Sequence, residues 1–356
     1  MSLEGCKRDF IRGSFGQNLK IPLQKECMKQ VSIIVPDGQC NVSSIVGPFK
    51  ILTRANGYYK SLGKEPVFNI QLVGSAKKVD LYDGLFSIQP NLNYKDVDKT
   101  NLVIIPAIDN SNLAASIQKN EHYIPWIIRH YKNGAAIGSI CTGAFLLAAT
   151  GLLDGRSCST HWNEASRFKK MFPAVNMVDD KLITDEAGLY TSGGAFSFLH
   201  FMLYLVEKYY DRETAIYCSK IFEIDIDRNS QSPFTIFSGL KDHQDEQIKM
   251  AQNYIENNVS MKISIEELAS KFAIGRRHFD RRFIKATTST PLEYLQKVKV
   301  EAAKKMLETS RKTISEVMYE VGYADVKAFR EVFRKITGLS PIEYRSHYNK
   351  EAVMQE

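Results

Sequence analysis

A pattern of apolar and basic residues near the C-terminal end constrains this chain more than any other feature. It begins with Ser264, a residue type that caps helices, and Glu267 lies three residues later, which is typical of a capping box. Apolar residues follow at helical spacing, at Ile265, Leu268, Ala269 and Phe272. After a short turn over residues 273–275, Phe279 and Phe283 anchor a second helix whose other face is basic. Helix, tight turn and basic helix in this order predict a helix-turn-helix unit.

The same pattern occurs a second time in the chain. Residues 313–317 repeat residues 264–268 at an offset of 49, and Phe329 and Phe333 repeat the phenylalanine pair at an offset of 50. The difference of one residue falls in the turn, which is longer in the second copy. A repeat in sequence indicates a repeated supersecondary unit. We therefore predict two helix-turn-helix motifs, with the phenylalanines of both in the core.

A long helix is predicted between the two motifs. From Pro291 to Glu308, apolar residues recur at helical spacing among charged ones. A helix of about 18 residues is roughly 27 Å long. A spacer of this length can hold two recognition helices about one turn of DNA apart.

The residues predicted to face DNA lie mainly near the start of the second helix of each motif. Five positive charges and one negative charge fall between Arg276 and Lys285. Arginine reads guanine through two parallel hydrogen bonds, whereas lysine on a phosphate adds affinity without sequence information. The predicted contacts are Arg276, Arg277, Asp280 and Arg281, with Arg282 at a phosphate, then Val326, Lys327, Arg330 and Glu331, with Asp325 as the N-cap. The alternative is a basic face that meets only solvent, and the repeat beside it disfavours that interpretation.

The second motif resembles the signature of AraC/XylS-type transcription regulators. The resemblance rests on Gly322-Tyr323, the phenylalanine pair, Thr337-Gly338 and Pro341-Ile-Glu-Tyr344-Arg345, and it runs from about Asp245 to Tyr348. One departure is Ala273, where the family often has glycine in the first turn. The resemblance implies binding to double-stranded promoter DNA and allows RNA polymerase as a further partner.

Length, charge and cysteine content limit the remaining choices. A chain of 356 residues is long enough for two or three domains. The net charge of +7 is mild, so total charge does not by itself indicate nucleic-acid binding. The six cysteines are scattered without a CxxC pair, which fits a reduced cytoplasm. We expect no signal peptide, no membrane partner, no metal site and no cofactor, because the matching sequence patterns are missing.

Strands and helices alternate in the first two thirds of the chain. Strands are predicted over residues 31–35, 67–73, 101–106 and 135–138, with an excursion over 79–88 and short strands near Val175, Leu182 and Tyr190. Helices are predicted over 43–62, 123–132, 163–171, 194–210 and 212–222. This alternation indicates a parallel sheet covered on both faces.

Cys141 lies at a bend where a nucleophile can act. Residues 138–143 are typical of a strand, a turn and a helix start, which is the geometry of a nucleophile elbow. A helix N-terminus at this place can lower a thiol pKa, and its amides can hold an oxyanion. Because His161 follows twenty residues later, a Cys/His pair is one interpretation.

The stretch from Cys141 to His161 resembles the ThiJ/PfpI superfamily, which is related to class I glutamine amidotransferases. Together with Thr191-Ser-Gly-Gly194, it looks like the GlxA-type regulators, which join such a domain to an AraC-type tail. The resemblance implies an α/β flavodoxin-like parallel-sheet sandwich that senses and dimerises, followed by an all-α domain with two helix-turn-helix motifs. The expected parts are a flexible tail over 1–28, the sensor domain over 29–227, a linker over 228–243, the DNA-binding domain over 244–348 and a tail over 349–356.

Two positions depart from the pattern of working enzymes in this superfamily. Ser44 stands where those enzymes carry an acid, and Asp37 lies upstream of that position. Asn163 replaces the glutamate of the amidotransferase His-x-Glu pattern. With no acid to orient the histidine or to take its proton, acid/base catalysis is poorly supported.

We therefore predict a DNA-binding regulator and not an enzyme, with an unknown small-molecule effector at the carboxyl ends of the parallel strands. The predicted lining residues are Ser44, Cys141, Thr142 and His161. A homodimer is expected from the resemblance. Three alternatives stay open: a hydrolase or glyoxalase-like enzyme at Cys141, a redox sensor that needs a low thiol pKa, and a purely structural cysteine.

Overall fold

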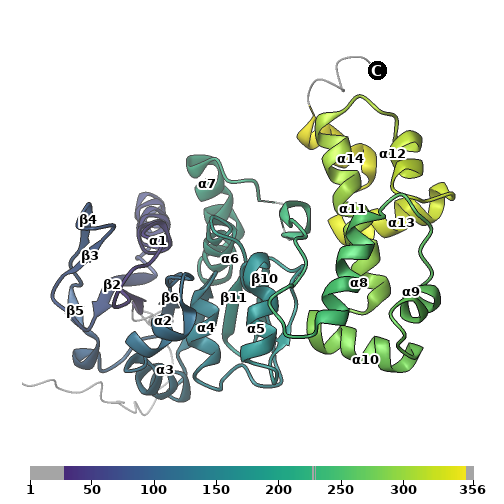
Figure 1. The fold of residues 1–356 in the computed structure, drawn as a ribbon. Coiled ribbons are helices and arrows are strands. Elements are labelled where there is room, and N and C mark those ends of the chain that lie inside the picture. Colours follow the sequence, from purple (N-terminus) through teal and green to yellow (C-terminus); the bar gives the residue numbers. More distant parts are fainter. Residues whose placement is uncertain (1–27, 227, 229, 350–356) are drawn as a thin grey trace, which may run out of the picture.

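The computed structural model describes residues 28–226, 228 and 230–349. An α/β unit is followed by an all-helical unit, and the two lie side by side (Figure 1). This arrangement confirms the predicted fold class. Apart from Met28 and Asn349, the predicted terminal tails lie outside the described residues, and the domain boundaries stay predictions. None of the described helices combines the length and the apolar character that a bilayer crossing requires.

A seven-stranded sheet forms the centre of the α/β unit. Its spatial order is β10-β11-β7-β6-β1-β2-β5, and all neighbouring pairs are parallel except β10 and β11. The strands are β1 (Lys29–Ile34), β2 (Phe68–Gly74), β5 (Leu92–Asn93), β6 (Leu102–Ile105), β7 (Ala136–Ile140), β10 (Ile183–Glu186) and β11 (Leu189–Ser192). All four residues of β6 are buried, as expected for a strand with both faces covered.

Helices cover both faces of this sheet, which therefore has two cores. In β6, Leu102 and Ile104 pack with α1 (Ser43–Ser61), α6 (Phe198–Tyr209) and α7 (Arg212–Phe222). The alternate residues Val103 and Ile105 pack on the other face, where the helices are α2 (Leu113–Lys119), α3 (Tyr123–Lys132), α4 (Gly143–Ala148) and α5 (Ala165–Met171). The period of two along the strand thus divides its side chains between the two layers.

Most predicted elements of this unit are confirmed, and the missed ones are short. The excursion over 79–88 is the hairpin of β3 (Val79–Leu81) and β4 (Phe86–Ile88). The strands and α-helices that the sequence did not predict are β5, α2 and β8 (Ser157–Cys158), which pairs with β9 (Asn176–Met177). Helix α2 buries only Leu113 and Ser116, so it has too little apolar periodicity to be recognised.

The helical unit contains the two predicted motifs. Its helices are α8 (Glu246–Asn257), α9 (Ile265–Lys271), α10 (Arg276–Thr287), α11 (Pro291–Thr309), α12 (Ile314–Glu320), α13 (Val326–Thr337) and α14 (Pro341–Tyr348). The phenylalanine pairs of α10 and α13 are fully buried, which confirms their core role. The predicted spacer helix is α11, within one residue of its expected end.

The helix caps differ between the two copies. Thr313 and Glu316 form a complete capping box at the start of α12. At the start of α9, Ser264 accepts a hydrogen bond from the Glu267 N–H, but its hydroxyl donates to Glu266. The predicted N-cap is therefore confirmed, and the predicted reciprocal bond from Glu267 is replaced by the contact with Glu266.

The two turns place different residues in left-handed backbone conformation. Ala273 has φ of 53° in the first turn, and Gly322 has φ of 72° at the matching position of the second. A Cβ added to Gly322 would lie 2.6 Å from the carbonyl oxygen of Ser260, whereas Ala273 already carries its Cβ. Only the second turn therefore requires glycine for space as well as for conformation.

We predict opposite effects of exchanging these two residues. Gly322→Ala is expected to lower the free energy of unfolding by about 2–4 kcal/mol, because it adds backbone strain and a clash with the Ser260 carbonyl. Ala273→Gly is expected to be neutral or to stabilise by up to about 1 kcal/mol, since relief of strain exceeds the added unfolded-chain entropy. Urea unfolding of both variants measures this difference. Equal stability of the wild type and Gly322→Ala would contradict the assignment.

Candidate nucleic-acid interface and small-molecule site

The first recognition helix, α10, exposes two arginines and holds two others in ion pairs. Arg277 and Arg281 are exposed, and the Arg281 guanidinium lies 3.0 Å from His278 Nδ1. Arg276 is paired with Asp280 at 3.0 Å and also with Glu266 of α9. Arg277 and Arg281 are thus the arginines of this helix that can reach DNA without first breaking an ion pair.

Arg282 has a role inside the domain. Its guanidinium donates two hydrogen bonds to Asp245, at 2.8 and 2.6 Å, and a third to Gln247 at 2.6 Å. Asp245 is the N-cap of α8, so the pair joins α8 to α10. The hydrogen bond from Arg282 holds the pKa of Asp245 below its usual range. The predicted phosphate contact of Arg282 stays untested, and these bonds give the residue a structural function.

The second recognition helix, α13, presents a mixed surface. The side chains of Lys327 and Glu331 are 86% and 68% exposed, and their charged atoms lie 4.0 Å apart. Val326 and Arg330 are exposed as well. Asp325 accepts a hydrogen bond from the Ala328 N–H, which confirms its predicted capping role. All four predicted contact residues of α13 therefore face solvent.

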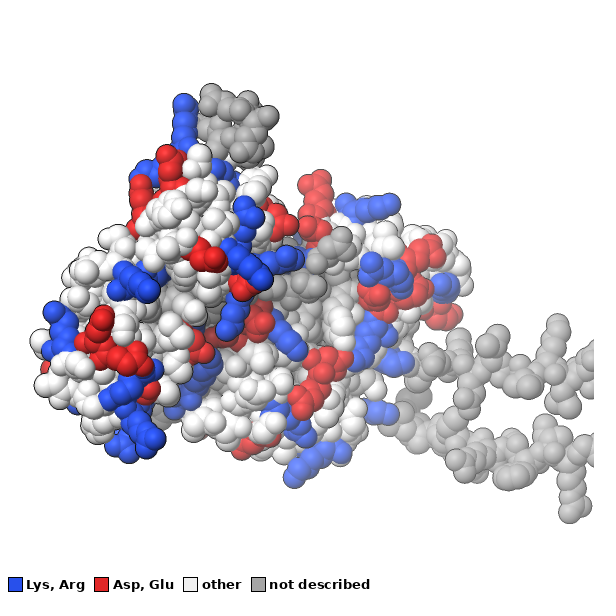
Figure 2. Space-filling model, turned by 90° about the vertical axis from the view of Figure 1, so that its right-hand side faces the viewer, with Lys and Arg blue, Asp and Glu red and all other residues white. Residues whose placement is uncertain are grey.

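Charge on this side of the molecule is local, not a continuous field. Figure 2 shows Lys and Arg side chains interspersed with Asp and Glu over the face that it presents. This distribution agrees with the mild net charge of +7. Among the described residues on this face, positive charge therefore comes from individual side chains and not from a continuous basic surface.

Cys141 lies at a strained turn between β7 and α4. Its φ is 54°, a conformation that side chains other than glycine seldom adopt. Its N–H donates to the Ser192 carbonyl at 2.8 Å, and its own carbonyl accepts from the Thr160 hydroxyl at 2.7 Å. The side chain is only 6% exposed. The predicted elbow geometry is thus present, but its thiol is closed to solvent.

Two of the other predicted lining residues are buried and already hydrogen-bonded. The Ser44 hydroxyl donates to the Asn41 carbonyl at 2.6 Å and accepts from the Ala107 N–H at 3.0 Å. The Thr142 hydroxyl donates to the Ile108 carbonyl at 2.6 Å. Both side chains hold the loop after β6 in place. Their contacts tie this loop to α1 and to the turn at Cys141.

An acid that the sequence reasoning missed lies beside the histidine. Glu164 is 6% exposed, 3.1 Å from Asn110 Nδ2 and 3.4 Å from Arg167. Burial lowers the pKa of His161, and the negative charge of Glu164 opposes this effect. Glu164 thus adds an acid near His161, with its carboxylate bonded to Asn110 and Arg167. The signal was a glutamate three residues after His161, which the short helix over 162–164 turns inward.

The environment of Cys141 does not activate it. Burial is the main influence and raises the pKa of the thiol to about 11, with a further increase from Glu164. A hydrogen bond from the Thr142 backbone acts in the opposite direction, and the helix that follows has only six residues. The lowering that a helix N-terminus can give a thiol pKa is thus outweighed here by burial. A thiol that stays protonated at neutral pH is a poor nucleophile and a poor redox sensor.

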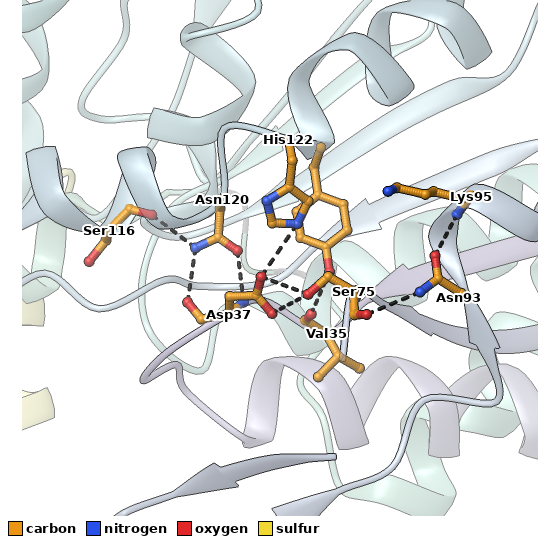
Figure 3. A network of polar contacts seen from close by, with 9 residues as sticks. Val35, Asp37, Ser75, Asn93, Lys95, Ser116, Asn120 and His122 are labelled. Atoms are coloured by element: carbon orange, nitrogen blue, oxygen red, sulfur yellow. Dashed lines mark hydrogen bonds and ion pairs between the residues drawn. The ribbon is translucent and has the colours of Figure 1, made fainter. Parts of the chain in front are cut away.

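Asp37 belongs to a separate polar network at the ends of β1 and β2 (Figure 3). Its carboxylate accepts from the Ser75 hydroxyl at 2.6 and 2.7 Å and lies 3.4 Å from His122 Nε2. Its backbone N–H and carbonyl bind the side-chain amide of Asn120. Asp37 thus connects two strands to the segment between α2 and α3.

The predicted linker is packed against both units. We call residues 230–240 the strap. On the α/β side, the buried Gln231 donates to the Thr160 carbonyl at 3.0 Å and its backbone N–H to the Asp180 carbonyl at 3.1 Å. On the helical side, the Phe237 N–H donates to Glu301 at 3.1 Å. Because Thr160 also binds the Cys141 carbonyl, hydrogen bonds lead from the elbow through the strap to α11.

We predict that Cys141 resists alkylation in the native protein. With a pKa of about 11, roughly one thiol in ten thousand is ionised at pH 7, and burial limits access further. Mass spectrometry after iodoacetamide treatment at pH 7 is expected to find Cys141 unmodified in the folded chain and modified in urea. Rapid modification of the folded chain would show an activated thiolate and would support the enzyme and redox alternatives.

Comparisons with known proteins agree with this architecture. Residues 29–208 match the DJ-1/PfpI family and residues 268–347 match a helix-turn-helix domain. The HTH-type transcriptional regulator GbdR of Pseudomonas aeruginosa is 27% identical over 227 residues, which are 63% of this chain and 61% of that protein. The HTH-type transcriptional regulator GlxA of Rhizobium meliloti is 25% identical over 221 residues, 58% and 64% of the two chains.

This chain spans 61% and 64% of the lengths of the two curated relatives. The crystal structure of an AraC family transcriptional regulator from Pseudomonas putida covers 55% of this chain and 99% of its own, with 17% identity and a TM-score of 0.43. The family match over 29–208 covers half of the sequence. The chain therefore belongs to the DJ-1/PfpI family, and it joins a domain of that family to an AraC-type helix-turn-helix domain.

Proposed function

We propose that this protein is a sequence-specific transcription regulator that binds double-stranded promoter DNA and responds to a small molecule. The observation that carries the proposal is a pair of helix-turn-helix motifs joined by one helix, α11. Their second helices expose predicted contact residues, Arg277 and Arg281 on α10 and all four on α13. The curated relatives named above are both transcriptional regulators, which supports the same role here. A homodimer and contact with RNA polymerase belong to this proposal.

The two recognition helices supply different chemistry. Arg277 and Arg281 of α10 are exposed donors suited to guanine, each good bidentate pair contributing roughly 1–3 kcal/mol of discrimination. In α13, Lys327 is suited to a phosphate, and Val326 to the methyl group of thymine. We therefore expect one half of the operator to be read mainly by arginine and the other by mixed contacts.

The length of α11 fits a two-part operator. Its 19 residues give a helix of about 28 Å, close to the ~34 Å of one turn of DNA. Arg276 and Asp280 can add contacts if the ion pair between them opens on DNA. The two motifs then read neighbouring major-groove segments on one side of the duplex.

An enzyme at Cys141 is the weaker proposal. Its buried thiol has a raised pKa, and Ser44 takes the place of the acid of working enzymes with a hydroxyl already bound to backbone groups. Glu164 and His161 are the residues that a catalytic alternative would use. A binding and signalling role for this domain needs no ionised thiol, so it agrees better with these properties.

We predict that Arg281→Ala weakens binding and relaxes selectivity at one half-site. Selection from a pool of random duplexes with the wild type would first define the operator. Binding constants are then compared for the wild type, for Arg281→Ala and for Arg212→Ala, an exposed arginine on α7 of the other unit. The loss expected for Arg281→Ala is roughly 1–3 kcal/mol, with reduced preference at one base pair and no change for Arg212→Ala.

Two results would contradict this proposal. Unchanged affinity and base preference in Arg281→Ala would remove that residue from the interface. A selection that enriches no sequence, and binding that depends only on salt, would remove sequence-specific reading altogether.

A further inference from the structure

A cleft lies between the two units and is lined by both of them and by the strap. Its volume is about 580 Å³, within the range of roughly 300–1,000 Å³ that is usual for small-molecule sites. Trp162 and Lys169 line it from the α/β unit, Phe237 from the strap, and Lys297 and Lys335 from the helical unit. None of the four predicted effector residues near Cys141 is among the described residues that line this cleft. Small-molecule sites form preferentially at such domain interfaces.

Two of the four lysines in the cleft are already neutralised. Lys169 pairs with Asp179 at 3.1 Å. Lys304, only 5% exposed, pairs with Glu301 at 2.8 Å and also donates to the Thr235 carbonyl of the strap. These ion pairs belong to the framework that holds the walls of the cleft.

The other two lysines are not paired with an acid. Among the described residues that line the cleft, neither Lys297 nor Lys335 has a carboxylate oxygen within 4.0 Å. Glu293 is the acid near them, and it accepts bonds from the Thr290 N–H and hydroxyl at 2.9 and 3.0 Å. Those bonds, and secondarily the charges of Lys297 and Lys335, hold the pKa of Glu293 below its usual range. Lys297 lies on α11 and Lys335 on α13, so two unpaired lysines line the cleft from two different helices.

An apolar wall stands beside these charges. The rings of Phe237 and Tyr294 pack edge to face with centroids 5.1 Å apart. The Lys297 ammonium lies 5.8 Å from the centroid of the Phe237 ring. The Tyr294 ring is held in position by a hydrogen bond, which its hydroxyl donates to Glu256 at 2.6 Å. A charged end and an apolar wall are therefore preorganised side by side.

We propose that this interdomain cleft is the effector site and that it binds a small organic carboxylate. The carboxylate lies against the ammonium groups of Lys297 and Lys335, and the apolar body packs against Phe237 and Trp162. This inference rests on the proposed function, because it names the location and chemical class of the effector of that regulator. It places the effector at the junction of the two units, away from the buried elbow.

Binding at this place can control DNA binding directly. A carboxylate in the cleft contacts the α/β unit, the strap and α11 at once, so it stabilises the arrangement in which these walls are close. The same arrangement fixes how the recognition helices lie relative to the α/β unit and its partner copy. The coupling is reciprocal, so operator DNA and carboxylate change each other's affinity by the same factor.

The test uses defined probes on the full-length protein. The protein contains two tryptophans, and Trp126→Phe leaves Trp162 of the cleft as the reporter. Benzoate, phenylacetate and hexanoate are titrated by Trp162 fluorescence and by calorimetry, with benzylamine and hexylamine as controls of opposite charge. We expect the carboxylates to bind and the amines not to bind. Calorimetry on the unsubstituted protein keeps the result independent of the Trp126 change.

Variants locate the site. Lys297→Met and Lys335→Met are each expected to weaken carboxylate binding roughly tenfold or more, because each removes one charge-assisted contact. Lys305→Met, an exposed lysine of α11 that does not line the cleft, is the matched control and is expected to bind like the wild type. Retained binding in both cleft variants with loss in Cys141→Ser would overturn the inference in favour of the elbow. Absence of carboxylate binding, or preference for the amines, would overturn it as well.

Operator binding by the same samples separates this inference from the proposed function. If the protein selects a DNA sequence but binds no carboxylate, the inference about the cleft is wrong and the proposed regulatory function stands. If the protein binds carboxylates, the two lysine variants lose this binding and no DNA sequence is selected, the inference about the cleft is supported and the proposed regulatory function is wrong.

Discussion

Helix α11 is shared by the cores of both helix-turn-helix motifs, and the geometry of the DNA-binding unit depends on this sharing. Leu295 and Val298 belong to the first core, and Ala303 and Leu307 to the second. Between them lies Lys299, only 5% exposed, whose ammonium donates to backbone carbonyls before α9 and in the turn after α12. A buried ammonium must keep its acceptors, so relative movement of the motifs would leave a charge unsatisfied. The two recognition helices are therefore held as one body.

The strap joins the α/β unit to the helical unit through hydrogen bonds on both sides. Gln231 reaches the Thr160 carbonyl next to the elbow, while Thr235 and Phe237 bind the buried Lys304–Glu301 pair of α11. A segment with so many partners at both ends does not act as a loose tether. A change on either side of the cleft must alter these bonds, and this gives a physical route between a bound carboxylate and the DNA-reading surface. In the proposed mechanism, the DJ-1/PfpI domain supplies one wall of this cleft.

The sequence predicted the elements that follow from periodicity and missed those that follow from tertiary contacts. The phenylalanine pairs, α11 and the alternating strands were recognisable because apolar spacing determines them. Glu164 was missed because only the short helix after His161 turns it toward the site. The raised pKa of Cys141 could not be foreseen either, since a strand–turn–helix pattern does not report burial. The packing of the strap could not be predicted, because backbone groups and buried polar side chains make its contacts. Polar residues in a sequence are typical of a linker.

The most direct test of this account concerns spacing and not affinity. If α11 holds the two recognition helices as one rigid body, both must read the same face of the duplex about one turn apart. Insertion of about five base pairs between the two parts of a selected operator rotates one part to the opposite face. Binding of the full-length protein to this duplex is expected to fall at least roughly tenfold. An insertion of about ten base pairs restores binding in part only if a partner copy bridges the gap. Unchanged affinity after the half-turn insertion would contradict the rigid two-headed reader.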